Sequence, residues 1–215
     1  MKKKRRIFTA VISGALTVIL ILLIRLVDVA PIGPQETSIG LSHLNRFVFE
    51  LFGVNMIWYH ITDWLGIAAV LTSFLFAITG LIQWIKRRSL LKVDREILTL
   101  GGLYLLVIGL YLLFENVIVN YRPIMMPGGT RLEASFPSSH TLLVCVIMGS
   151  AAILMKKYIK KKALRRVLQA VCYAIIGVTV FGRLIAGVHW FTDIIGGILI
   201  SVVLLSLFQV IKGSE

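Results

Sequence analysis

The stretch FTDIIGGILISVVLLSLFQVI, residues 191–211, decides the fold class, because its only charged side chain is that of Asp193. About 20 apolar residues suffice for a helix to cross the hydrocarbon core of a bilayer. The whole chain of 215 residues is 58% hydrophobic and 15% charged, whereas soluble domains average about 25% charged residues. This composition excludes an ordinary soluble domain and indicates an integral membrane protein.

Five further apolar runs precede this stretch, and we predict that all six runs form membrane-spanning helices. The runs cover residues 7–27, 61–85, 97–121, 139–155, 167–188 and 191–211. A basic stretch precedes the first run, as in a signal peptide, but the apolar core is longer than the about 7–15 residues typical there. We therefore expect a retained span. The predicted fold is all-α, a six-helix membrane bundle that forms a single domain over residues 1–215.

The basic residues alternate between the predicted connections. Eighteen of the 23 lysines and arginines lie before the first run, between runs two and three, between runs four and five, or after run six. The positive-inside rule then predicts a multi-pass protein of the plasma membrane with both termini in the cytoplasm. The net charge of +13 is explained by these anchors, so we expect the bilayer as a partner and no nucleic acid.

The long connection between runs one and two has a helical pattern of its own. Apolar residues recur there at helical spacing: Leu41, Leu44, Phe47, Val48, Leu51 and Phe52. We predict an amphipathic helix on the outer membrane surface, capped by Gly53. Simple packing is favoured over a role as a lid. Near the end of run one, Arg25 and Asp28 are three residues apart and are expected to pair.

Polar residues gather in three places, within residues 115–123, 136–140 and 182–193. Ionisable groups in or beside a span are costly and are functional candidates by default. The predicted topology brings all three clusters to the outer side. We therefore expect one extracytoplasmic site.

The residue types in these clusters suit an anionic substrate. Arg122 and Arg183 supply guanidinium groups that bind phosphate oxygens in pairs. The predicted helix that begins near Ser139 adds free backbone N–H groups and a positive dipole end. His189 and Asp193 are four residues apart, so in a helical turn the carboxylate is expected to orient the imidazole.

A metal site is the chemical alternative, with His140, His189, Asp193 and either Glu115 or Glu133 as ligands. The two arginines disfavour it, because they would repel a divalent cation. We therefore expect no metal and no cofactor. The two cysteines lie in apolar runs and are interpreted as core residues.

These residues resemble the type 2 phosphatidic-acid phosphatase superfamily, which includes bacterial undecaprenyl-diphosphate phosphatases. The resemblance covers roughly residues 95–211. The family pattern is lysine, six residues and Arg-Pro, then Pro-Ser-Gly-His, then Ser-Arg, five residues, His, three residues and Asp. It matches here in spacing at 115–123, 137–140 and 182–193.

The resemblance implies a role for each matching position. His189 would attack phosphorus, Asp193 would hold its tautomer, and His140 would protonate the leaving oxygen. The implied phosphate-binding groups are Arg122, Arg183, Ser138 and the backbone near Ser139. The family needs no metal ion.

Three positions depart from the pattern. Glu115 replaces the lysine, Ser139 replaces a glycine and Gly182 replaces a serine. Glu115 reverses a charge, so it either weakens phosphate binding, meets a cationic head group, or supports Arg122 through a salt bridge. The nearby Arg131 and Glu133 are interpreted as a solvated loop face.

The predicted function is hydrolysis of a phosphate monoester or diphosphate of a membrane lipid through a phosphohistidine. The predicted lipids are isoprenyl diphosphate or a phosphatidic-acid or phosphatidylglycerophosphate type. Two alternatives stay open. One is a transferase that moves a phosphoryl or phospho-head group between lipids, and the other is a non-catalytic lipid-binding derivative of the same scaffold. Neither the exact lipid nor the oligomeric state follows from the sequence.

Overall fold

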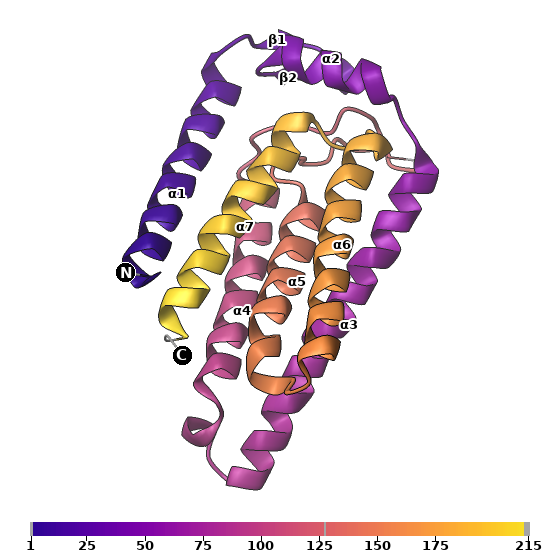
Figure 1. The fold of residues 1–215 in the computed structure, drawn as a ribbon. Coiled ribbons are helices and arrows are strands. Elements are labelled where there is room, and N and C mark those ends of the chain that lie inside the picture. Colours follow the sequence, from indigo (N-terminus) through magenta and orange to yellow (C-terminus); the bar gives the residue numbers. More distant parts are fainter. Residues whose placement is uncertain (1, 127, 213–215) are drawn as a thin grey trace.

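The computed structural model describes residues 2–126 and 128–212 (Figure 1). The helices in these ranges are α1 (Lys2–Leu26), α2 (Ser42–Phe52), α3 (Met56–Arg87), α4 (Arg95–Asn116), α5 (Ser139–Tyr158), α6 (Lys162–Ala186) and α7 (Phe191–Ile211). Strands β1 (Ala30–Pro31) and β2 (Ser38–Ile39) pair antiparallel, and η1 (Pro34–Glu36) and η2 (Leu90–Lys92) are 3-10 turns. Within the described ranges, six helices, all but α2, are long and apolar enough to span a membrane. The six-helix bundle is thus confirmed.

Two helices end earlier than the sequence predicts. The third predicted run extends to residue 121, but α4 ends at Asn116, and Val117 leaves the helical conformation at φ −100° and ψ 81°. The fifth run extends to residue 188, but α6 ends at Ala186 because Gly187 turns the chain at φ +66°. A Cβ on Gly187 would lie 2.0 Å from the carbonyl oxygen of Gly53, so only glycine fits this turn.

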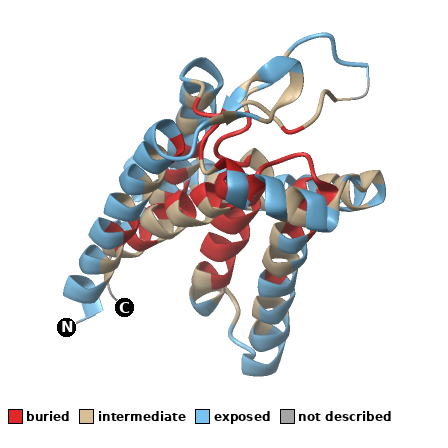
Figure 2. Cartoon of the chain, turned by 90° about the horizontal axis from the view of Figure 1, so that it is seen from above, coloured by how far each residue is buried: buried red, intermediate tan, exposed pale blue. Residues whose placement is uncertain are grey.

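Helix α5 lies in the middle of the bundle and packs against α3, α6 and α7. Most of its residues are buried, as the red core of Figure 2 shows. Small residues let its neighbours approach, which is how helices associate in lipid, where the hydrophobic effect is weak. At Gly149, a Cβ would lie 2.6 Å from the side chain of Leu205 on α7. The first turn of α5, which carries His140, therefore rests on a well-packed helix.

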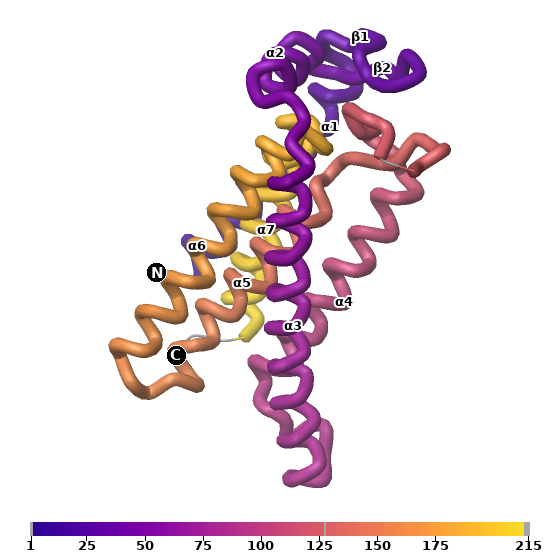
Figure 3. Tube along the Cα trace, turned by 90° about the vertical axis from the view of Figure 1, so that its right-hand side faces the viewer, coloured from indigo at the N-terminus to yellow at the C-terminus, as the bar shows by residue number. Residues whose placement is uncertain are grey.

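The predicted interfacial helix is α2, which lies across one end of the bundle (Figures 1 and 3). It ends at Phe52, before Gly53 at φ +64°. Its apolar residues Leu44, Phe47 and Leu51 are exposed, whereas Asn45 is buried. Such an orientation suits a helix whose apolar face meets lipid.

The predicted pair of Arg25 and Asp28 is wrong. Arg25 donates instead to the carbonyl oxygen of Ile118. Asp28 follows the end of α1 and accepts hydrogen bonds from Ser42 Oγ (2.9 Å), His43 N (2.8 Å) and His43 Nδ1 (2.6 Å). The hydrogen bond from the His43 backbone holds the pKa of Asp28 below its usual 3.8.

An ionic cluster joins α3, α4 and α5 at the opposite end. Asp94 accepts from Arg87 (2.8 Å) and from the hydroxyl of Tyr158 (3.1 Å), and Lys157 lies 2.6 Å from Glu96. Partial burial opposes the charge of Asp94, but these donors prevail and lower its pKa to about 2. This is the end where the basic residues concentrate.

Candidate active site

The connection between α4 and α5 folds back on itself and brings two distant segments together. Tyr121 forms an antiparallel bridge with Ala134. Beside it, Arg122 N donates to the carbonyl oxygen of Glu133 (3.1 Å), and Ser135 N donates to that of Asn120 (2.9 Å). The fold-back places the polar residues of both segments at the same end of the bundle.

The start of α7 fits closely against this loop. A Cβ on Gly196 would lie 2.3 Å from the ring of Phe136, so the glycine permits the approach. The backbone N–H of Ser138 donates to the carbonyl oxygen of Asp193 (3.0 Å). The three polar clusters predicted from the sequence therefore do meet.

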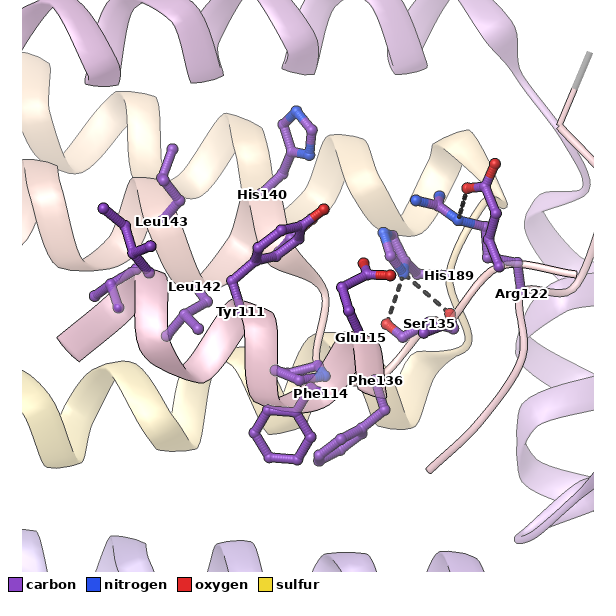
Figure 4. Close-up of a pocket in the computed structure, with 16 residues that line it drawn as sticks. Tyr111, Phe114, Glu115, Arg122, Ser135, Phe136, His140, Leu142, Leu143 and His189 are labelled. Atoms are coloured by element: carbon purple, nitrogen blue, oxygen red, sulfur yellow. Dashed lines mark hydrogen bonds and ion pairs between the residues drawn. The ribbon is translucent and has the colours of Figure 1, made fainter. Parts of the chain in front are cut away.

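A cavity of about 510 Å³ opens where they meet (Figure 4). Its polar lining includes Glu115, Arg122, Glu133, Ser135, Ser139, His140 and His189. Apolar side chains continue the wall along α4 and α5, among them Val107, Ile108, Leu142 and Leu143. One cavity thus offers a polar end for a head group and an apolar wall for an alkyl chain.

His189 lies in the short connection before α7 and is only 4% exposed. Its Nδ1 is 3.1 Å from the carbonyl oxygen of Ser135 and 3.1 Å from Ser135 Oγ. A carbonyl oxygen only accepts, so Nδ1 carries the proton and Nε2 carries the free electron pair. Among the described residues, Nε2 has no hydrogen-bond partner. The ring of a cavity-lining histidine is thus fixed with its unprotonated nitrogen free.

The surroundings of His189 also keep its ring neutral. Burial, followed by the positive charge of Arg122, holds its pKa well below the usual 6.5. At neutral pH the imidazole is therefore uncharged, as a nucleophile or a base must be.

Asp193 does not contact His189 directly, contrary to the expected pairing across a helical turn. Ser135 lies between them: its hydroxyl donates to Asp193 Oδ2 at 2.5 Å and accepts from His189 Nδ1. Asp193 also accepts from the side-chain amide of Asn120 (3.1 Å) and from Trp190 N (2.9 Å). The predicted helical spacing fails because His189 precedes α7, which begins at residue 191.

Ser135 has no role predicted from the sequence, although it stands two residues before the second motif. Asn120 belongs to the first polar cluster but likewise has no predicted role. Both are almost fully buried, and both bind Asp193. In a single sequence, the only indication that Ser135 connects His189 with Asp193 is its position close to the histidine motif at 137–140.

Arg183 is fully buried and is absent from the lining of the cavity. It donates to Asp63 of α3, and its guanidinium carbon lies 4.9 Å from the centre of the Tyr59 ring. Asp63 Oδ1 also lies 3.0 Å from His140 Nε2. Asp63 could not be predicted as a site residue, because it lies in the apolar run 61–85, far from the motifs.

Arg122 lines the cavity and lies 2.9 Å from a carboxylate oxygen of Glu133. Glu133 is exposed, as expected for a solvated loop face, and it also lines the cavity. The predicted salt bridge between Glu115 and Arg122 is absent from the described residues. Its premise of a continuous helix fails, because α4 ends at Asn116.

The two serines of the second motif have different surroundings. Ser139 begins α5 and lines the cavity, whereas Ser138 is fully buried and its hydroxyl accepts from Thr141 at 3.1 Å. Ser138 takes the predicted N-cap position, but among the described residues its side chain makes no capping bond. Binding of phosphate by Ser138 stays a prediction.

Within residues 2–126 and 128–212, no group of three His, Cys, Asp or Glu side chains is arranged to hold a metal ion. Arg122 lines the cavity and adds positive charge beside His189, which disfavours a divalent cation there. The donor set at the cavity therefore suits an anion.

Fold and site together define a multi-pass membrane protein with an anchored histidine and an arginine at one cavity. The family model of the PAP2 superfamily matches residues 96–213, more than half of the chain. The chain belongs to the PAP2 superfamily, as its sequence motifs indicate.

A solved structure supports the fold over nearly the whole length. The chain is similar to a transmembrane PAP2-type phosphatidylglycerolphosphate phosphatase from Bacillus subtilis, with 17% sequence identity and a TM-score of 0.64. The match covers 94% of each chain. A search of the curated proteins finds no match.

Proposed function

We propose that this protein hydrolyses a phosphate monoester or diphosphate of a membrane lipid through a phosphohistidine intermediate. The observation that carries the proposal is the free, neutral Nε2 of His189 at a cavity that Arg122 and His140 also line. Membership of the PAP2 superfamily and the fold of a PAP2 phosphatase support it. The apolar wall along α4 and α5 favours a lipid over a soluble ester.

The proposed reaction has two steps. His189 Nε2 attacks phosphorus, the bond to the leaving oxygen breaks, and His140 gives its proton to that oxygen. Water then attacks the phosphohistidine while His140 takes a proton from it, so that inorganic phosphate leaves and both histidines return to their starting states. Arg122 is assigned to the charge that develops on the phosphoryl oxygens.

The site is proposed to face the extracytoplasmic side. The cavity is lined by the last turn of α4 and the first turn of α5, whereas Asp94 and Lys157 lie at the opposite ends of these two helices. Because most basic residues lie at that other end, the positive-inside rule supports this orientation.

A transferase is the second candidate, and Glu115 is the observation that favours it. This carboxylate lines the cavity where the family has a lysine, so it suits a cationic acceptor such as an amine-bearing lipid. Assays with and without such acceptor lipids separate transfer from hydrolysis, because transfer yields a phosphorylated acceptor in place of free phosphate.

The central test is a phosphate-release panel on purified protein in mixed micelles. It covers isoprenyl diphosphate, phosphatidic acid and phosphatidylglycerophosphate, with and without chelator. We expect release that survives chelation and vanishes in His189→Ala. The matched control is His43→Ala, which removes an exposed histidine outside the cavity and should keep activity. No release from any of the lipids would overturn the proposal.

The same panel addresses Glu115. Replacing Glu115 by lysine changes the local charge by two units toward positive. We expect a several-fold higher kcat/KM on phosphate monoesters, because attraction replaces repulsion of the phosphate. Unchanged or lower turnover would show that the carboxylate does not limit this chain.

A further inference from the structure

One face of α3 is directed at the site, although α3 lies outside the region that matches the family model. Thr62 and Asp63 lie three and four residues after Tyr59, and Gly66 follows them by four and three residues, so all four share one face of the helix. Tyr59 contacts Arg183, and Asp63 contacts both Arg183 and His140. Gly66 leaves room for the imidazole ring of His140. The face therefore supports the site from a helix that carries none of the sequence motifs.

Asp63 makes the decisive contacts. The same carboxylate oxygen, Oδ1, accepts from the guanidinium of Arg183 and lies 3.0 Å from His140 Nε2. Arg183 is fully buried, so its charge needs a partner at this place. A single oxygen thus fixes the relative position of two side chains on different helices, α5 and α6.

Close packing strengthens the arrangement. A Cβ on Gly66 would lie 3.0 Å from His140 Cδ2, and a Cβ on Gly182 would lie 2.5 Å from the side chain of Thr62. The ring of Tyr59 covers the guanidinium of Arg183 at 4.9 Å. Helix α3 thus leaves little space for either side chain to change its rotamer.

We propose that Asp63 is a positioning residue that holds the imidazole of His140 in register for proton transfer and is itself held by the buried guanidinium of Arg183. The inference rests on the proposed function. Asp63 takes no proton and forms no bond in the reaction. It keeps the ring of His140, which lines the cavity, beside the leaving oxygen, while the buried guanidinium of Arg183 holds the carboxylate in place. Reaction rates depend steeply on such placement, and an error of about 1 Å costs about 100-fold.

The test compares Asp63→Asn with Asp28→Asn. Both variants neutralise a carboxylate that contacts a histidine at the same end of the protein, but Asp28 contacts His43, which does not line the cavity. We expect Asp63→Asn to lower kcat about 10- to 100-fold and to weaken vanadate binding. Asp28→Asn should leave both unchanged. Asp63→Glu, which keeps the carboxylate, should recover part of the lost kcat.

A second readout does not need turnover. The chain has four histidines, so the side-chain ¹⁵N resonances can be assigned one by one. We expect Asp63→Asn to shift the resonances of His140 and Asp28→Asn to shift those of His43.

Three results would overturn the positioning role. An unchanged His140 resonance would show that the contact has no effect on the ring. Tighter vanadate binding with higher kcat/KM would show that the carboxylate competes with phosphate. A lower melting temperature with kcat per folded molecule unchanged would show a purely structural role. Wild-type protein without phosphate release would instead count against the proposed function, while the ¹⁵N spectra would still decide the inference.

Discussion

His189 and His140 line the same cavity but are held in different ways. His189 is buried and its Nδ1 is hydrogen-bonded to Ser135, whose hydroxyl in turn donates to Asp193. His140 lies on a well-packed helix and contacts a charged carboxylate, Asp63, through Nε2. The first ring keeps its reactive nitrogen free, whereas the second has that nitrogen engaged. The difference teaches that one ring is held with a free nitrogen and the other with that nitrogen occupied, which supports the proposed division between attack on phosphorus and proton transfer.

Replacing each histidine in turn tests this difference most directly and should have the largest effect on activity. We expect His189→Gln to lower kcat by at least about 10³-fold, because no other side chain forms the covalent intermediate. His140→Gln should cost about 10²- to 10³-fold, since loss of one general acid leaves the nucleophile in place. Rapid-quench trapping of a phosphorylated protein distinguishes them: only His140→Gln should still form it. A phosphorylated His189→Gln protein would contradict the assignment.

Cutting the link between His189 and Asp193 should have the next largest effect. Ser135→Ala removes the hydroxyl but keeps the backbone carbonyl that also accepts from Nδ1. We therefore expect kcat to fall about 10- to 100-fold, less than for loss of the ring itself. Ser201→Ala serves as the control, because the hydroxyl of this buried serine donates to two backbone carbonyls, Gly197 O (2.6 Å) and Leu142 O (3.4 Å). Equal kcat in the two variants would show that Ser135 does not orient the ring.

The pH profile sharpens the comparison further. His189 must be neutral to attack, and its pKa lies well below the usual 6.5 because of burial and the nearby Arg122. The acid limb of kcat/KM should therefore lie below pH 6.5, with full activity above it as far as this group is concerned. Arg122→Gln removes one positive charge, so the acid limb should move toward higher pH. A shift toward lower pH would contradict the electrostatic cause.

The smallest effect is expected at the far end of the bundle. The pKa of Asp94 is depressed to about 2 in the folded state, so its stabilisation is present above pH 4 and is lost as the pH falls toward 2. After allowance for solvent screening, Asp94→Asn should cost about 1 kcal/mol at neutral pH. Thermal unfolding in detergent should show this loss, while kcat/KM per folded molecule should stay unchanged. A change in KM would show that this end communicates with the cavity.

Much of the architecture could be predicted from the sequence, because apolar length and helical periodicity are local properties. The six spans, the surface helix and its end at Gly53 are of this kind. The motif spacing also brings His140, His189 and Arg122 to one cavity. These successes rest on physics that acts within a helix or between a helix and the bilayer.

The partners of the site residues could not be predicted, because they depend on how loops fold and how helices rotate. Ser135 reaches Asp193 only because residues 117–138 turn back. Asp63 reaches His140 only because α3 presents one particular face. Spacing along the sequence wrongly suggested a direct contact of His189 with Asp193, since the chain is not helical between residues 187 and 190.

The amide of Asn45 has a geometric consequence for the whole molecule. It donates to Thr192 Oγ1 (3.1 Å) and accepts from Thr192 N (3.2 Å), one residue before Asp193. Because both bonds hold α2 at a fixed roll, its exposed apolar residues keep a constant position relative to Asp193 and the neighbouring cavity.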